Sequence, residues 1–243
     1  MQENTEIKEN SRRVLMDIPS YPTPEELFKI LMSSKGWDYK TNMEKFLLRD
    51  RALVSILYVA ELRISEALRL TKDQFENKGD FIHVKSILLS KRKKGKVAYR
   101  DARLPLEGSR AVFTELIMSY LDTLADGQRL FPWSLETTRY PIKDSFYTTK
   151  AGERKQRYAH IMIGTKRAWQ IINAFFPNLD PEGKEPKTIE THGITQHWLR
   201  AFGEDYLYDA FDHDVYALAD EVKVDPRTID KYIRGRARRY KPA

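Results

Sequence analysis

A small set of arginine, histidine and tyrosine residues has the types and spacing needed to act on a phosphate group. His197 and Arg200 are three residues apart, so on a helix their side chains share one face. Arg63 lies at a predicted helix start between two apolar stretches, where it needs an anion, either Glu66 or an external phosphate oxygen. Tyr232, on a short predicted helix followed by a basic tail, can present its phenol to a bound phosphate. Each residue alone also fits an ordinary structural role, so the hypothesis depends on their acting together.

The charged residues are gathered in runs of opposite sign. The 243-residue chain carries 42 Lys and Arg against 35 Asp and Glu, a net charge of +7. The basic runs are 91–100, which includes Arg100 and has no acid, and 227–241, which has one acid. This pattern predicts a basic face for a polyanionic partner, with the acidic stretch 204–221 facing solvent or a partner subunit. Solvated faces explain such runs equally well, and that alternative stays open.

The composition excludes several other classes. The chain has no cysteine, which excludes a disulfide scaffold, a Cys-ligated zinc site and a cysteine nucleophile, and fits a reducing cytosol. It has no Gly-rich phosphate loop, no His-Glu-x-x-His and no Gly-x-Ser-x-Gly. Asp212, His213 and Asp214 fit a solvated helix face better than a metal site, so no metal is expected. No apolar run approaches the ~20 residues of a membrane span, and no signal peptide is evident.

The elements that must position these residues are mostly helical. Thr23 as N-cap and Pro24 in the first turn predict a helix to about residue 34. Residues 81–89 and 97–104 predict two strands of a hairpin with a lysine-rich turn. The fold class is therefore mainly α with a small antiparallel β-hairpin sheet (α+β). Further helices are expected over 44–60, 64–71, 108–125, 165–176, 194–209, 214–222 and 226–234.

The order of the motifs resembles the catalytic domain of tyrosine recombinases, the phage-type integrases and Xer-like enzymes. The stretch 62–68 is similar to the family's first arginine box, and the lysine-bearing hairpin that ends in 103–106 is similar to its second element. His197-x-x-Arg200 looks like the third motif, and Tyr232, 32 residues after Arg200, looks like the nucleophile. The likeness covers about 25–240, which implies a catalytic domain over 23–243 behind a flexible leader, 1–22.

The resemblance implies a site-specific DNA recombinase or integrase that cuts and rejoins DNA through a covalent 3′-phosphotyrosine at Tyr232. Arg63 and Arg200 would stabilise negative charge on the non-bridging phosphate oxygens. His197 would accept the phenol proton or donate to the oxyanion, and Glu66 would buttress Arg63.

A hairpin lysine would protonate the leaving oxygen. Lys91 is the choice for that role, with Lys93, Lys94 and Lys96 as alternatives. A solvated turn explains any one of these lysines as well. The residues expected to contact DNA are Arg92, Lys93, Lys94, Lys96, Arg234, Arg236, Arg238 and Arg239.

Several departures from the family pattern matter. The first box normally reads Gly-Leu-Arg, whereas this chain has Glu61 at the glycine position. Nine residues before the tyrosine the family usually has His or Trp, whereas this chain has Lys223, which can still donate to a phosphate oxygen. In this it resembles divergent archaeal or viral members. An insertion around 126–160 is expected, because Arg63 and Arg200 are further apart than in compact members. The family's N-terminal DNA-clamping domain is missing from 1–22, which predicts a fragment or a minimal member.

The resemblance also implies partners and a compartment. Double-stranded DNA is the expected partner, bound by a homo-oligomer, a tetramer on DNA, whose C-terminal tails can be exchanged between subunits. No cofactor and no membrane association are expected, and the protein is expected in the cytoplasm, encoded by a prokaryotic cell or a virus. Two alternatives stay open: a catalytically inactive DNA-binding relative, and a DNA-relaxing enzyme similar to type IB topoisomerases.

Overall fold

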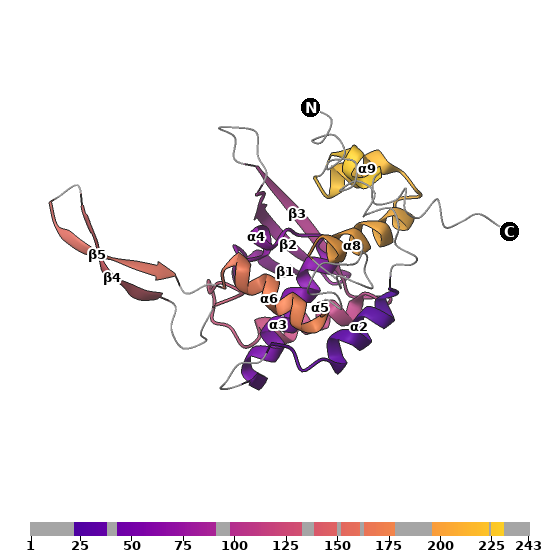
Figure 1. Cartoon of the computed structure of the whole chain (residues 1–243). Helices are drawn as coiled ribbons and strands as arrows, with labels where there is room; N and C mark the ends of the chain where they lie inside the picture. The colour runs from indigo at the N-terminus through magenta and orange to yellow at the C-terminus, as the bar shows by residue number, and fades with distance from the viewer. Residues whose placement is uncertain are drawn as a thin grey trace, which may run out of the picture.

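Helices pack against a small antiparallel sheet in this chain (Figure 1). The computed structural model describes residues 22–37, 43–90, 98–132, 139–149, 152–160, 163–177, 196–223 and 225–230. The expected fold class, mainly α with a small antiparallel sheet, is confirmed. No helix in this described part of the chain has the length and apolar character needed to span a bilayer.

The first helix is fixed by its N-terminal cap. In α2 (Pro24–Ser33), the Glu26 amide donates to Thr23 Oγ1 at 3.2 Å and the Thr23 amide donates to Glu26 Oε2 at 2.8 Å. This reciprocal capping box satisfies two amide groups that the helix leaves without a partner. The predicted helix start at Thr23-Pro24 is confirmed.

The central helix is α3 (Met43–Val59). Its second half is buried on every side, from Ala52 through Val59, which is typical of a helix in the middle of a core. It packs against α5 and α8. Its carboxyl end leads into the short α4, whose N-cap residue is Arg63. The other helices are α4 (Ile64–Ala67), α5 (Ala111–Leu121), α6 (Thr165–Phe175), α8 (Gln196–Ala210) and α9 (Val215–Glu221).

The sheet has three antiparallel strands in the order β1-β2-β3. β2 (Phe81–Leu88) and β3 (Tyr99–Pro105) form the predicted hairpin, with Ile82 opposite Leu104 and Val84 opposite Ala102 on the buried face. β1 (Phe75–Asn77) pairs with β2 and was not predicted, because three residues are too short to show an alternating pattern.

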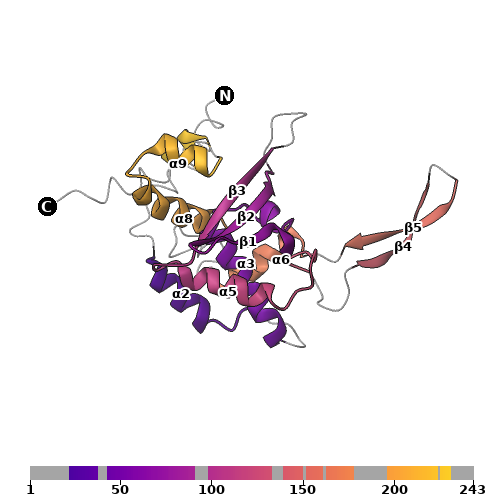
Figure 2. The ribbon, with the colours of Figure 1, turned by 180° about the vertical axis from the view of Figure 1, so that it is seen from behind.

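A second, separate hairpin lies between α5 and α6. β4 (Arg139–Thr148) and β5 (Arg154–His160) pair in antiparallel orientation and extend away from the helices in both views (Figures 1 and 2). They fall in the expected insertion, 126–160, for which the sequence predicted no elements. Leu130 and Phe131, in the same stretch, are buried in the main core. That this stretch is an insertion relative to the family stays a prediction.

The apolar side chains form two clusters of unequal size. The main cluster joins α2, α3, α5, α6, the inner face of the sheet and the first half of α8. The smaller cluster is formed by Leu218, Ala219, Val222 and Ile229, with partly buried residues of α8 packed against it. It therefore holds α9 and the helical turn 226–230 against the second half of α8.

Candidate functional site

Arg63 is held at the start of α4 by Glu66. The Arg63 amide donates to Glu66 Oε2 at 3.0 Å, and Arg63 Nη1 donates to Glu66 Oε1 at 2.9 Å. The Arg63 side chain keeps 27% of its surface exposed, whereas that of Glu66 keeps 1%. The internal partner expected for Arg63 is therefore present, and its guanidinium stays accessible from one side.

Glu66 also connects this arginine to the β2–β3 hairpin. Its Oε1 accepts from the Ser90 amide at 3.0 Å and from Ser90 Oγ at 2.9 Å, and Ser90 directly precedes Lys91 in the chain. Burial acts to raise the pKa of Glu66, but these hydrogen bonds from Arg63 and Ser90 outweigh it, and the pKa lies below its usual range. The ionised Glu66 carboxylate therefore links Arg63 to Ser90, at the end of β2.

Arg200 lies in α8 and is buried. Its Nε donates to Glu204 Oε1 at 2.6 Å, and neither side chain is more than 6% exposed. The expectation that the whole acidic stretch 204–221 faces solvent is wrong for Glu204, because this carboxylate lies beneath Arg200 in the core. His197, one turn earlier, is exposed. The two residues are three apart on one helix, as predicted, but the prediction of a shared face is not matched by their burial, since Arg200 is buried and His197 is exposed.

Arg100 on β3 is buried, so the prediction that it belongs to a basic run facing DNA is wrong. Arg100 is 5% exposed and its Nη2 donates to the Ala60 carbonyl. Burial lowers its pKa, the charge of Glu61 opposes this, and Arg200 lowers it further; Glu66 and Glu204 raise it. Both the Glu66 and the Glu204 carboxylates thus act on Arg100. The alternation of side chains along β3 could have predicted this burial, since Arg100 lies on the same inward face as Ala102.

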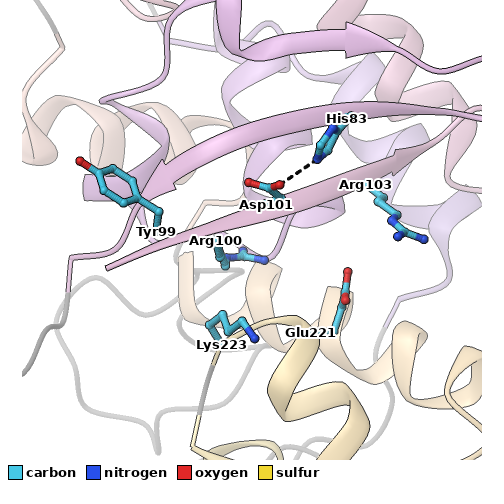
Figure 3. A pocket seen from close by; sticks show the side chains of 7 residues that line it. All are labelled: His83, Tyr99, Arg100, Asp101, Arg103, Glu221 and Lys223. Atoms are coloured by element: carbon cyan, nitrogen blue, oxygen red, sulfur yellow. Dashed lines mark hydrogen bonds and ion pairs between the residues drawn. The ribbon is translucent and has the colours of Figure 1, made fainter. Parts of the chain in front are cut away.

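A cavity of about 520 Å³ lies between β3 and the end of α9. Figure 3 shows Arg100 between the strand and Lys223, which lies just beyond α9. Lys223 adopts a positive φ of 49° and its Nζ donates to Asp220 at 2.9 Å. The cavity is lined by His83, Tyr99, Arg100, Asp101, Arg103, Glu221 and Lys223. Lys223 therefore lies at the same cavity as the buried Arg100.

The remaining predicted site residues lie outside the described residues. The described chain ends with the helical turn 226–230, whose Ile229 is fully buried against α9. Among the described residues, no group of three or more His, Asp and Glu could hold a metal ion. The residues outside are Lys91, Arg92, Lys93, Lys94, Lys96, Tyr232, Arg234, Arg236, Arg238 and Arg239.

Comparison with known proteins gives matches among solved structures. No family model and no curated protein matches the chain. It is similar to the XerH site-specific recombinase bound to palindromic difH substrate in a post-cleavage complex, with a TM-score of 0.49 and 19% identity, over 87% of this chain and 48% of that one. For the pre-cleavage XerH complex the values are 0.47 and 22%, over 88% and 50%.

A second protein, the Tn1549 transposon integrase in complex with circular intermediate DNA, gives a TM-score of 0.48 and 16% identity, over 89% of this chain and 63% of that one. The chain thus spans about half the length of the XerH chains and less than two thirds of the integrase chain.

Proposed function

We propose that this chain is a DNA strand transferase of the tyrosine recombinase type, which cuts and rejoins DNA through a covalent 3′-phosphotyrosine at Tyr232. The observation that supports it most is the tie made by Glu66, which binds both Arg63 and Ser90 at the foot of the lysine-bearing hairpin. Arg100 connects these groups to the His197-x-x-Arg200 motif, because the charges of Glu66, Glu204 and Arg200 all shift its pKa. Motifs that are far apart in the sequence thus share one cluster of charges.

The reaction is a transesterification in two reversible steps. The Tyr232 phenol oxygen attacks phosphorus, its proton passes to His197, and the bond from phosphorus to the 5′ oxygen breaks. That oxygen takes a proton from Lys91 and leaves as a 5′ hydroxyl. In the second step a 5′ hydroxyl attacks the phosphotyrosine and releases Tyr232.

The two arginines have the character this reaction needs. Charge grows on the non-bridging oxygens in the transition state, and a guanidinium is always protonated and binds two oxygens at once. Glu66 fixes Arg63 while leaving part of its surface open to a phosphate. Glu204 fixes the Nε edge of Arg200, so α8 itself orients that guanidinium plane. Lys223, at the cavity beside Arg100, donates a further hydrogen bond to a phosphate oxygen.

Double-stranded DNA is the proposed partner, bound by a tetramer of this chain whose C-terminal tails are exchanged between subunits. The contacts are assigned to the basic residues at 92–96 and 234–239. Phosphate contacts release counterions, so affinity should fall steeply as the salt concentration rises. A flat salt dependence would contradict this assignment.

The direct test is trapping of the covalent adduct on a DNA duplex with a 5′-bridging phosphorothiolate. The released thiol rejoins poorly, so the wild type should accumulate an SDS-resistant protein–DNA adduct. Tyr232→Phe should form none, while Tyr240→Phe, a matched tyrosine in the same tail, should form it normally. Arg63→Ala and Arg200→Ala should each lose about 3–4 kcal/mol of transition-state stabilisation, measured as slower adduct formation.

Other outcomes identify the alternatives. DNA binding without an adduct on any duplex would favour the inactive DNA-binding relative. Relaxation of supercoiled plasmid by a monomer without a specific site would favour the topoisomerase-like enzyme. An adduct that persists in Tyr232→Phe would mean that the nucleophile is another residue.

A further inference from the structure

The corner between α3 and α4, residues 60–63, is held by side chains that the proposed reaction does not use. Glu61 adopts a positive φ of 48°, in the left-handed region that favours glycine and that other residues adopt only where their surroundings hold them. Arg63 follows two residues later, so the backbone direction at this corner determines the position from which the Arg63 side chain extends. The groups that hold Glu61 therefore bear on the position of Arg63.

Arg110, at the start of α5, binds the corner through a buried ion pair. Its Nη2 donates to Glu61 Oε1 at 2.7 Å and to the Tyr58 carbonyl at 3.0 Å. The Glu61 and Arg110 side chains are 4% and 2% exposed. The guanidinium also lies over the rings of Tyr58 and Tyr206, 4.9 Å from each centroid. One buried cation thus joins the end of α3, the corner and α8.

Two further contacts close the corner from other sides. Arg100 donates to the Ala60 carbonyl from β3, which satisfies a carbonyl that the end of α3 leaves open. Gly203 of α8 lies so close that a Cβ there would be 2.3 Å from the Tyr58 carbonyl oxygen and 2.9 Å from Glu61 Cγ. β3, α5 and α8 therefore meet at this corner.

We infer that Glu61 and Arg110 are positioning residues, which hold the α3–α4 corner so that Arg63 is presented to the phosphate in a fixed orientation. This inference rests on the proposed function only in assuming that Arg63 binds the phosphate. The claim that the pair holds the backbone of this corner does not depend on any reaction with DNA. The pair acts through the backbone of residues 60–63, and neither residue is assigned a contact with DNA.

The test uses the double variant Glu61→Gly/Arg110→Met in the full chain. It removes both charges together, so it avoids the unpaired buried ion that either single variant would leave. Glycine adopts the positive φ freely, so the double variant should fold while the corner loses its tie to α5. Glu61→Gln also removes the counter-ion of Arg110, but its amide oxygen can still accept the hydrogen bond from Arg110 Nη2, so the corner keeps its tie to α5. It is therefore the conservative variant. Asp50→Asn is the matched control, because Asp50 forms a buried ion pair with Arg49 away from the corner.

The first measurement is amide hydrogen exchange at Glu66 and Ala67, whose amides donate to the Arg63 carbonyl. Exchange there should be at least about tenfold faster in the double variant than in the wild type, with α5 unchanged, as expected for local opening. Asp50→Asn and Glu61→Gln should keep the wild-type rate at these two amides. Unchanged exchange in the double variant, or equal loss in Glu61→Gln, would overturn the inference.

The second measurement separates binding from reaction. The double variant should bind duplex DNA with an unchanged Kd but form the covalent adduct on the order of 100-fold more slowly at saturating DNA, because a displacement of about 1 Å costs that much. Faster exchange with an unchanged adduct rate would overturn the positioning role and leave the proposed function intact. If the wild type forms no adduct, the proposed function fails, and exchange alone decides whether the pair holds the corner.

Discussion

At the scale of single residues, Glu66 connects two parts of the candidate site, Arg63 and Ser90. It accepts hydrogen bonds from the backbone and side chain of both Arg63 and Ser90. These bonds favour the ionised carboxylate over the acid. The folded protein therefore holds Glu66 ionised at pH values where the unfolded chain would take up a proton.

This linkage predicts a dependence of stability on pH. A carboxyl whose pKa is lower in the folded than in the unfolded state adds stability at neutral pH and loses it as the pH falls through the folded pKa. The wild type should be more stable than Glu66→Gln by about 2 kcal/mol near pH 7. Below about pH 4 the unfolded chain takes up a proton while the folded chain stays ionised, so the difference should shrink. It is lost once the pH has fallen through the lowered pKa of Glu66 in the folded protein.

The measurement is thermal unfolding of the two proteins between pH 7 and pH 3. Glu107→Gln, whose side chain is exposed, is the control and should follow the wild-type curve. A constant difference between wild type and Glu66→Gln over this range would contradict the linkage.

The sequence predicted residue pairs that are close along the chain and missed those joined by the tertiary fold. Glu66 could be named as the partner of Arg63 because three residues on a helix start bring them together. The burial of Arg100 depends on the end of α3 lying against β3, where the Ala60 carbonyl accepts from the guanidinium. No local sequence pattern indicates this contact. Glu204 looked like part of an acidic surface, although it is the i+4 partner of Arg200.

At the scale of elements, α8 matters because it carries Arg200 and packs against the end of α3. The two helices approach each other closely at Gly203, where a Cβ would lie 2.3 Å from the Tyr58 carbonyl oxygen. A backbone carbonyl cannot move aside as a flexible side chain can. The position of α8, and with it that of Arg200, is therefore set by the absence of a side chain at residue 203.

Gly203→Ala should for this reason destabilise the protein by about 1–3 kcal/mol, although alanine normally favours a helix. The expected result is a lower Tm in thermal unfolding and slower covalent adduct formation. Gly164→Ala is the matched control, since a Cβ there meets nothing within 4 Å, and its effect should be smaller. An unchanged Tm in Gly203→Ala would mean that the two helices approach each other less closely.

The long elements could be predicted from periodicity, whereas short or irregular ones could not. α3, α5, α6 and α8 were predicted close to their observed bounds because their apolar positions recur over ten residues or more. β1 has three residues, and β4 contains a proline and two charged residues in its middle. Such strands have too little pattern to distinguish them from loops.

At the scale of the whole molecule, the β4–β5 hairpin stands apart from the other described elements. Both views show it extending beyond the helices (Figures 1 and 2). A two-stranded hairpin has little apolar surface to bury by itself, so it adds little to global stability. The rest of the fold should therefore keep its stability without it.

Replacing residues 139–160 by a short Gly-Ser linker tests this expectation. The variant should unfold cooperatively, with a Tm within roughly 4 °C of the wild type, because 1 kcal/mol corresponds to about 2–4 °C for a domain of this size. Thermal unfolding by circular dichroism is the measurement. Loss of cooperative unfolding would show that the hairpin is needed by the main core.

The unequal size of the two apolar clusters has a consequence for motion. The smaller cluster rests on Leu218, Ala219, Val222 and Ile229, whereas the main one joins six elements or more. Opening of residues 215–230 exposes few apolar side chains, so its free-energy cost is a fraction of that of global unfolding. We therefore expect residues 215–223 and 225–230 to open at a lower free-energy cost than the main core that holds Arg63 and the first half of α8 with Arg200. The smaller cluster can therefore open locally while the main core, which holds the arginines, stays folded.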